Sequence, residues 1–289
     1  MSGAPSLAPT RIGPTTFRWG ERTFVMGILN VTPDSFSGDG LLGDADPIAA
    51  AVARARVMVD HGADLLDVGG ESTRPGHEPV DATQEAARVV PVIAALRAAL
   101  PGMPISIDTT KPAVAEAALH AGADLLNDVW GTDPSDTLAD VAAAHGVPIV
   151  VMHNRREAVY GDLIPEVLAD LRAAVERAVA AGVPAGDVIV DPGIGFGKTA
   201  DHNVALLHDL SRLRELGQPI LLGTSRKSTI GRILDLPAEE RLEGTLATTA
   251  LGIAAGVDVI RVHDVRANVR AARVSDAIVR GTWHAEADR

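Results

Sequence analysis

The stretches HGADLLDVGG (residues 61–70), AGADLLNDVW (121–130) and AGVDVIRVHD (255–264) share one pattern, and this pattern decides the fold. In each, an alanine-rich helical segment ends at a glycine, a short apolar run follows, and polar residues come directly after it. Glycine is favoured at such a helix end because it adopts the left-handed conformation without steric cost. The pattern predicts helix-to-strand units in series, and therefore a parallel sheet with helical crossovers.

The same pattern extends along the chain and predicts eight strands. They are TFVMGIL (23–29), DLLDV (64–68), PISID (104–108), DLLND (124–128), PIVVM (148–152), VIVD (188–191), PILLG (219–223) and VIRV (259–262). Helical periodicity lies between them. It covers residues 46–62, 81–100, 111–121, 135–145, 164–181, 203–216, 242–255 and 265–280.

Eight such units predict one (β/α)8 barrel, also called a TIM barrel. The barrel domain is expected over residues 15–289, after a flexible N-terminal tail at 1–14, and a short hairpin is expected to turn at Trp19-Gly20. A doubly wound open sheet is the alternative, but that fold usually has fewer strands. The first strand is also followed by Asn-Val-Thr-Pro rather than by a glycine-rich dinucleotide fingerprint.

Composition excludes several classes of partner and of binding site. The net charge of −12 argues against nucleic acid or an anionic membrane as a partner. The absence of cysteine excludes disulfides and thiolate metal sites, and it indicates a reducing compartment. The first 14 residues have no apolar signal region, so a cytoplasmic enzyme is expected.

Only three of the 26 basic residues are lysines, and each follows a predicted strand. Lys111 follows ISID, Lys198 follows VIVD and Lys227 follows ILLG. A lysine kept in a chain that prefers arginine suggests a need for a compact ammonium group. The three positions point to one site, although Lys111 also suits the simpler role of beginning a helix and is left out of the catalytic set.

Polar residues stand at the end of nearly every predicted strand, where a barrel places its catalytic groups. They are Asn30, Asp67, Asp108, Asn127, Asp128, Met152 with His153, Asp191, Ser225 to Lys227, Arg261, His263 and Asp264. About half of these aspartates are expected to cap the following helices instead. The long loops at 30–44 and 69–80 are candidates for a lid, and SRKSTIG (225–231) offers cations at a helix start that suits an anion.

Seven motifs in this order resemble the bacterial dihydropteroate synthases of folate biosynthesis. They are LNVTPDSFS, GGESTRPG, SIDT-x-KP, ND at 127–128, DPGIGFGK, GTSRKS and RVHDV, and the resemblance runs from about residue 23 to residue 275. The resemblance implies a homodimeric, Mg2+-assisted transferase. Such an enzyme joins p-aminobenzoate to (7,8-dihydropterin-6-yl)methyl diphosphate, releases 7,8-dihydropteroate and diphosphate, and is the target of sulfonamides.

The resemblance also implies roles for individual residues. The pterin would be bound by Asp108, Asn127, Met152, Asp191, Phe196, Lys227 and Arg261. The diphosphate would be bound by Asn30, Arg261 and His263, with Asn30 also at the metal. The p-aminobenzoate side would be formed by Phe36, Thr73, Arg74, Pro75 and Ser228. Asn30, Lys227, Arg261 and His263 form the catalytic set.

One departure from the family pattern is visible, because Gly38-Asp39 stands where the family usually has Asp-Gly. This leaves the role of Asp39 in loop closure open. The expected chemistry is dissociative: the C–O bond to diphosphate breaks, and the departing anion is stabilised by the metal, Asn30 and His263. An arylamine attacks without prior deprotonation, so no strong general base is required.

Two other functions remain open at this point. A pterin-dependent methyltransferase shares the barrel but should lack the SRKS cations and the NVTPDSFS loop. A non-catalytic paralogue would be expected to have eroded loops. His61, His120 and His145 are expected to cap helices, whereas His153 and Lys198 could belong either to the pocket or to the scaffold.

Overall fold

The protein was examined as a computed structural model that describes residues 7–32, 46–71, 80–133, 135 and 137–283. Eight parallel strands form the central sheet, each within two residues of its predicted position. They are β3 (Phe24–Asn30), β4 (Leu65–Gly69), β5 (Ile105–Asp108), β6 (Leu125–Asp128), β7 (Ile149–Met152), β8 (Val188–Asp191), β9 (Leu221–Leu222) and β10 (Val259–Val262). Because β9 has only two residues, its pairing with the neighbouring strands is correspondingly short.

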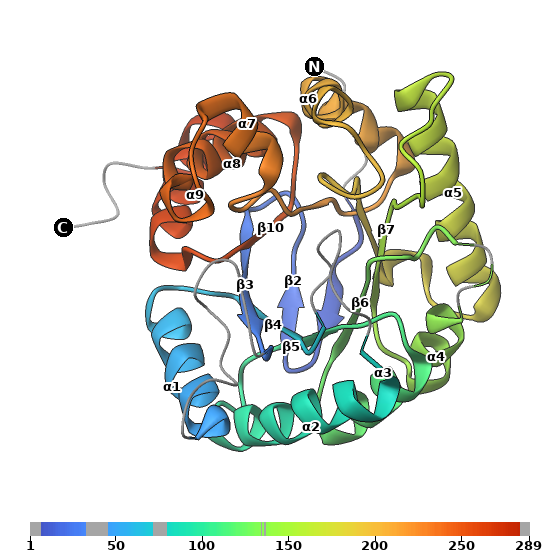
Figure 1. The fold of residues 1–289 in the computed structure, drawn as a ribbon, viewed down its shortest axis with the longest axis vertical. Helices are drawn as coiled ribbons and strands as arrows, with labels where there is room; N and C mark the ends of the chain where they lie inside the picture. The colour runs from blue at the N-terminus through green and yellow to red at the C-terminus, as the bar shows by residue number, and fades with distance from the viewer. Residues whose placement is uncertain (1–6, 33–45, 72–79, 134, 136, 284–289) are drawn as a thin grey trace.

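The sheet closes into a barrel. Its strand order is β8-β7-β6-β5-β4-β3-β10-β9, and a parallel bridge between Val190 and Ile220 joins the two ends. The amide of Val190 also donates to the carbonyl of Pro219 over 2.9 Å. The predicted (β/α)8 barrel is therefore confirmed, and Figure 1 shows its helices arranged around the strands. Closure matters for function because it turns the C-terminal ends of distant strands toward one mouth.

The helices cover the outside of the barrel. They are α1 (Pro47–Asp60), α2 (Ala82–Ala99), α3 (Pro112–Ala121), α4 (Leu138–His145), α5 (Leu163–Ala181), α6 (Ala200–His208), α7 (Ser228–Leu234), α8 (Leu242–Ala255) and α9 (Val265–Val279). The predicted helix over 203–216 is divided into α6 and a 3-10 segment at Leu210–Leu216. Periodicity did not reveal α7 as a separate helix, because its seven residues are too few for a clear pattern.

The glycines and histidines that the sequence predicts at helix ends are found there. Gly122 closes α3 and Gly256 closes α8, both in the left-handed conformation. His61 is the C-cap of α1, and His120 and His145 lie in the last turns of α3 and α4. These three histidines therefore lie at helix ends, as expected.

The N-terminal hairpin differs from its prediction. It pairs β1 (Thr10–Ile12) with β2 (Thr15–Phe17), so it turns at Gly13-Pro14 and not at Trp19-Gly20. Gly13 has a φ of 55°, which glycine adopts freely. Trp19 is buried instead, and its indole N–H donates to the hydroxyl of Thr10 over 2.9 Å. The tail predicted at 1–14 is consequently too long, because Thr10–Ile12 is an ordered strand with two buried residues.

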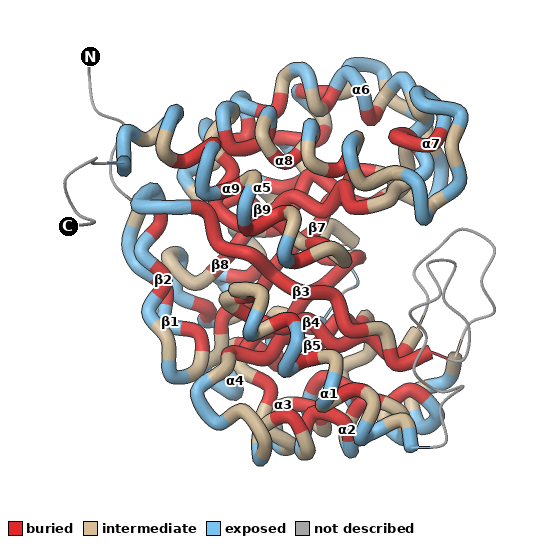
Figure 2. The backbone as a smooth tube through the Cα atoms, turned by 90° about the vertical axis from the view of Figure 1, so that its left-hand side faces the viewer, coloured by how far each residue is buried: buried red, intermediate tan, exposed pale blue. Residues whose placement is uncertain are grey.

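The hairpin closes the N-terminal end of the barrel. The rings of Phe17 and Phe24 lie 4.6 Å apart, and Trp19 stacks edge-on to Phe24 at 5.5 Å. They form one buried cluster with residues from the strands, including Met26, Leu65, Leu125, Val150, Ile189, Leu221 and Val259. Figure 2 shows β1 and β2 at one end of the buried strands. The aromatic plug blocks this end, so a ligand must enter from the other.

Candidate active site

The polar residues predicted at the strand ends lie in the interior layer of side chains next to the aromatic plug, on its C-terminal side. Side chains alternate between the two faces of a strand, so a residue two positions after a plug contact also points into the barrel. This relationship links Leu65 to Asp67, Leu125 to Asn127, Val150 to Met152, Ile189 to Asp191 and Val259 to Arg261. The sheet therefore gathers these polar side chains in one interior layer.

Arg261 organises one half of this layer. Its Nε donates to Asp67 Oδ2 over 2.5 Å, and its Nη2 donates to Asp108 Oδ2 over 2.6 Å. Asn127 Nδ2 donates to the same oxygen of Asp67 over 3.1 Å. Burial raises the pKa of Asp108 to about 7, against the opposing effect of the Arg261 guanidinium. Among the described residues, Asp108 Oδ1 has no hydrogen-bond partner, so it is available to a ligand.

Lys227 and Asp191 form the other half. A methyl group built on Gly223 would lie 3.8 Å from Lys227 Nζ, 3.9 Å from Arg261 Cβ and 3.9 Å from Asp191 Oδ2. The three side chains therefore border the same small space. Burial lowers the pKa of Lys227 to about 8, although Asp191 opposes this shift. Burial also raises the pKa of Asp191.

The loop after β8 supplies the wall of the site beside Lys227. Lys227 Nζ donates to the carbonyl of Ile194 and lies 4.5 Å from the centre of the Phe196 ring. An ammonium group over an aromatic face is attracted by the ring quadrupole. Phe196 therefore lies beside Lys227, another of the residues that the resemblance implies for the pterin.

Asn30 and His263 lie at the ends of β3 and β10. A methyl group built on Gly69 would lie 3.9 Å from Asp108 Oδ2 and 4.0 Å from Asn30 Oδ1, which places Asn30 beside Asp108. His263 Nδ1 is 2.9 Å from the hydroxyl of Ser225. Ser228 is the first residue of α7 and is exposed. These positions surround the mouth of the barrel above the buried layer.

The chain matches known proteins over most of its length. A family model described as "Pterin binding enzyme" matches residues 26–263. Dihydropteroate synthase from Bacillus subtilis is 52% identical over 266 residues, covering 92% of each chain. The chain belongs to the dihydropteroate synthase family.

Solved synthase structures agree with this assignment. A dihydropteroate synthase from Clostridium difficile, solved in the presence of pteroic acid, superposes with a TM-score of 0.87 at 48% identity. The match covers 91% of this chain and 99% of that one. A synthase from Xanthomonas albilineans with 4-aminobenzoic acid has a TM-score of 0.87 at 41% identity, covering 94% and 98%. The resemblance seen in seven motifs is thus confirmed at the level of the family.

Some residues predicted for the synthase site lie outside the described residues. They are Phe36, Thr73, Arg74 and Pro75, together with Asp39. Their roles on the p-aminobenzoate side remain predictions from the resemblance. Ser228 is the member of that group whose position the structure gives.

The structure does not bring all three lysines together around Gly223. Lys111 is the N-cap residue of α3 and pairs with Glu71 and, over 2.6 Å, with the buried Glu85. Lys198 contacts the loop after β8, and its Nζ is 2.8 Å from His153 Nδ1. Lys227 alone among the lysines lines the layer around Gly223. A common position after a strand does not decide which way each side chain points.

Asp67 is a strand-end aspartate that does not cap a helix. It is fully buried and accepts hydrogen bonds from both Arg261 and Asn127. The signal was available, because Asp67 is two residues after Leu65 in a strand of alternating faces. His153, in contrast, follows the inward-facing Met152 and therefore points out of the barrel, toward Asp170 of α5.

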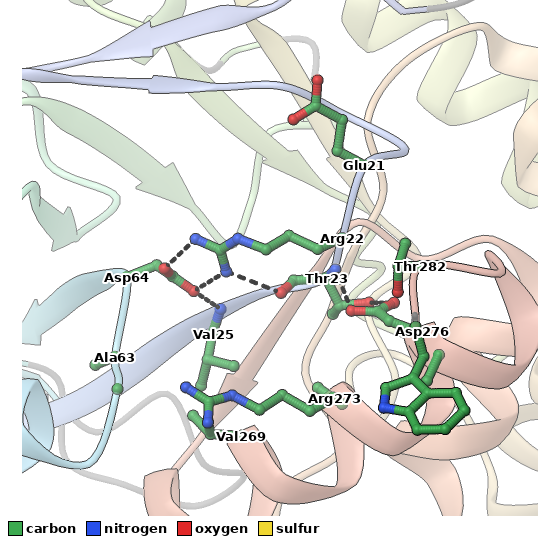
Figure 3. A pocket seen from close by; sticks show the side chains of 14 residues that line it. Glu21, Arg22, Thr23, Val25, Ala63, Asp64, Val269, Arg273, Asp276 and Thr282 are labelled. Carbon is green, nitrogen blue, oxygen red and sulfur yellow. Dashed lines mark hydrogen bonds and ion pairs between the residues drawn. The ribbon is translucent and has the colours of Figure 1, made fainter. Parts of the chain in front are cut away.

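A groove of about 670 Å³ opens at the opposite end of the synthase barrel, near the start of β3 and β4 (Figure 3). Arg22 pairs there with Asp64 over 2.6 Å, and Asp64 also accepts from the amide of Val25 over 2.8 Å. Asp276 of α9 accepts from the amide of Thr23 over 2.7 Å. None of the predicted site residues lines this groove, and Asp276 joins α9 to the barrel there.

Proposed function

We propose that this protein condenses p-aminobenzoate with (7,8-dihydropterin-6-yl)methyl diphosphate to give 7,8-dihydropteroate and diphosphate. One observation carries the proposal. Asp191, Lys227 and Arg261 border a single space at Gly223, and Arg261 connects it to Asp108. This arrangement of acids and cations around one space occurs in a chain that is about half identical to dihydropteroate synthases.

The buried layer suits a flat pterin. The ring presents an amino group and an N–H that need acceptors, and a carbonyl that needs a donor. Asp108 and Asp191 would accept, Asn127 would add an amide, and Lys227 would donate to the carbonyl edge. The unpartnered Asp108 Oδ1 supports this, because a buried carboxylate oxygen without a partner costs free energy until a donor arrives.

The walls of the pocket would hold the ring in place. Met152 is buried at the end of β7, and Phe196 lies on the facing loop. Arg261 would pack over the ring, held by its two carboxylate partners. A site whose side chains hydrogen-bond to the polar edges of a substrate discriminates strongly against analogues that lack those polar groups.

Asn30, Arg261 and His263 would bind the diphosphate. Among the described residues, no cluster of three acids or histidines could hold a metal by itself. Magnesium usually keeps waters and takes substrate phosphates with only one or two protein oxygens, so the amide oxygen of Asn30 fits such a site. Bound Mg2+ would neutralise negative charge on the leaving diphosphate. His263 and Arg261 would add fixed positive charge or hydrogen-bond donors beside the diphosphate. His263 is held in place by its hydrogen bond with Ser225.

The p-aminobenzoate would bind at the mouth near Ser228, and the resemblance implies that Phe36 and Thr73 to Pro75 also bind it. A related synthase from Yersinia pestis has been solved with a sulfonamide drug complex. We expect sulfonamides to compete with p-aminobenzoate here as well. The arylamine would attack the methylene carbon as diphosphate leaves, with its lone pair forming the new C–N bond and its proton passing to water.

The protein is also proposed to be a cytoplasmic homodimer, as its family resemblance implies. The absence of cysteine supports a reducing compartment. Within the described residues, no helix is long and apolar enough to span a bilayer. Sedimentation equilibrium of the purified full chain would measure the oligomeric state directly.

Pyrophosphate release tests the proposed reaction. Release from the pterin diphosphate should require both Mg2+ and p-aminobenzoate, with dihydropteroate formed in equal amount. Lys227→Ala and Asp191→Asn should each lower kcat/KM by about 100-fold or more, because each removes a buried charge from the site. The exposed Arg212→Ala serves as the matched control. Methyl transfer without pyrophosphate release would instead support a methyltransferase.

A further inference from the structure

Four acceptors lie around the ammonium group of Lys198, and the carbonyl of His153, at 3.4 Å, is the most distant of them. Nζ is 2.8 Å from His153 Nδ1, 3.0 Å from the carbonyl of Phe196 and 3.1 Å from the carbonyl of Gly193. A lysine ammonium has three N–H donors and no acceptor. The geometry therefore offers acceptors to the charged form of Lys198, although burial lowers the pKa of this lysine to about 7.

His153 is arranged to accept from Lys198. Its side chain is fully buried, and its Nε2 is 3.2 Å from Asp170 Oδ2. A proton on Nε2 satisfies Asp170 and leaves Nδ1 as an acceptor for the ammonium. Burial, with the neighbouring charge of Lys198, lowers the pKa of His153 to about 3, so the imidazole stays neutral.

The loop that Lys198 anchors is also fixed from other sides. Asn203 Oδ1 accepts from the amide of Gly195 over 2.8 Å, and the hydroxyl of Tyr160 donates to the carbonyl of Gly197 over 2.7 Å. The backbone of Gly193 approaches His153 so closely that a methyl group there would lie 1.8 Å from the His153 carbonyl oxygen. The loop over 193–198 therefore has one conformation defined by many contacts.

This loop connects Lys198 to Lys227. The carbonyl of Ile194 accepts from Lys227 Nζ, and the Phe196 ring lies 4.5 Å from the same nitrogen. Lys198 binds the carbonyl of Phe196 itself and that of Gly193, the residue before Ile194. Any shift of the loop would therefore move both groups that hold the Lys227 ammonium.

We propose that Lys198 is a positioning residue for the pterin half of the site. It acts through the 193–198 loop, which sets the place of the Lys227 ammonium. The proposal rests on the proposed function, because it assumes that Lys227 binds the pterin. The simpler alternative is that Lys198 only stabilises the scaffold, in which case its removal would weaken folding without a specific effect through Lys227.

A double-mutant cycle separates these two roles. Pterin affinity would be measured by fluorescence with 6-hydroxymethylpterin for the wild type, Lys198→Met, Lys227→Met and the double variant. Lys198→Met should weaken pterin binding by about 10-fold or more, but by less than about 3-fold when Lys227 is already methionine, because coupled residues are not additive. The KM for p-aminobenzoate should stay within about twofold, since the effect is confined to the pterin side.

Lys111→Met is the matched control, because Lys111 is also a partly buried, ion-paired lysine. It should lower stability and leave pterin affinity unchanged. Tyr160→Phe removes a single hydrogen bond to the same loop, and it provides a milder probe if Lys198→Met does not fold. It should weaken pterin binding by a few-fold, about the value of one hydrogen bond, and only while Lys227 is present.

The outcomes are distinguishable. If Lys198→Met or Tyr160→Phe weakened pterin binding by the same factor in the wild type and in Lys227→Met, the positioning role would be overturned. An unchanged pterin affinity in Lys227→Met would instead overturn the site assignment in the proposed function. Non-additive loss of pterin affinity, with an unchanged KM for p-aminobenzoate, supports the proposal.

Discussion

Arg261 donates from Nη2 to Asp108 Oδ2 over 2.6 Å, although 153 positions separate the two residues in the chain. Their strands are not neighbours, since β3 and β4 lie between β10 and β5 in the sheet. The pair therefore spans the barrel interior. Asp108 is buried and the Arg261 side chain is 20% exposed, so the loss of the arginine would leave a buried carboxyl group without its counterion.

Arg261→Leu should lower the free energy of unfolding by about 3–5 kcal/mol, because it leaves Asp67 and Asp108 buried without their counterion. Urea unfolding of both proteins at neutral pH would measure the change. Arg212→Leu breaks an exposed pair with Glu215 and should have no measurable effect. A loss for Arg261→Leu no larger than that of this control would contradict the prediction.

Asp108 should make stability depend on pH. Its pKa in the folded protein is about 7, above the ordinary value of 3.8, so the folded state binds this proton more tightly. The resulting stabilisation is fully present below pH 3.8 and is lost as the pH rises through 7, by at most about 4 kcal/mol.

Unfolding curves of the wild type and Asp108→Asn between pH 4 and pH 8 would isolate this effect, because the amide does not titrate. We expect the wild type to lose stability relative to Asp108→Asn as the pH rises across this range. A constant difference between the two proteins at every pH would show that Asp108 has an ordinary pKa.

Pterin affinity should fall in alkaline solution through Lys227. Burial lowers the pKa of this lysine to about 8, so its ammonium loses a proton above that pH and donates less well to the pterin carbonyl. We expect the dissociation constant to rise toward about tenfold per pH unit above the pKa. Lys227→Arg keeps its charge, and its pH profile should be flatter. Absorbance titration of the free pterin would correct these profiles for ionisation of the ligand. Identical corrected profiles for the wild type and Lys227→Arg would exclude Lys227 as the titrating group.

The aromatic plug should matter for stability and not for binding. Phe17→Ala removes a fully buried ring and should cost about 3–5 kcal/mol of unfolding free energy. Because the plug lies at the N-terminal end, pterin affinity of the folded variant should remain within about twofold. Ile278→Ala, on an exposed side chain of α9, is the control for stability. A large loss of affinity in folded Phe17→Ala would mean that the two ends of the barrel are coupled.

Much of the site could be predicted because short, local sequence patterns specify where its residues lie. Glycine-closed helices and apolar runs located the strands, and the residues after those runs had to lie at the barrel mouth. Asp191 and Lys227 were found in this way. The predicted hairpin position is wrong although Gly13-Pro14 is itself a turn signal, because the burial of Trp19 depends on contacts with Thr10 and Phe24 that the sequence does not show.

By itself, the sequence determined the order of the strands and helices, the end of each strand and the polar residue types available there. These properties follow from backbone preferences and from the two-residue and 3.6-residue periods of side chains. Only the tertiary structure decided that Asp67 pairs with Arg261, and that Lys198 and Lys227 both contact one loop but have different side-chain partners. Such contacts depend on barrel closure between Val190 and Ile220, because distances across an interior are set by how the whole sheet curves.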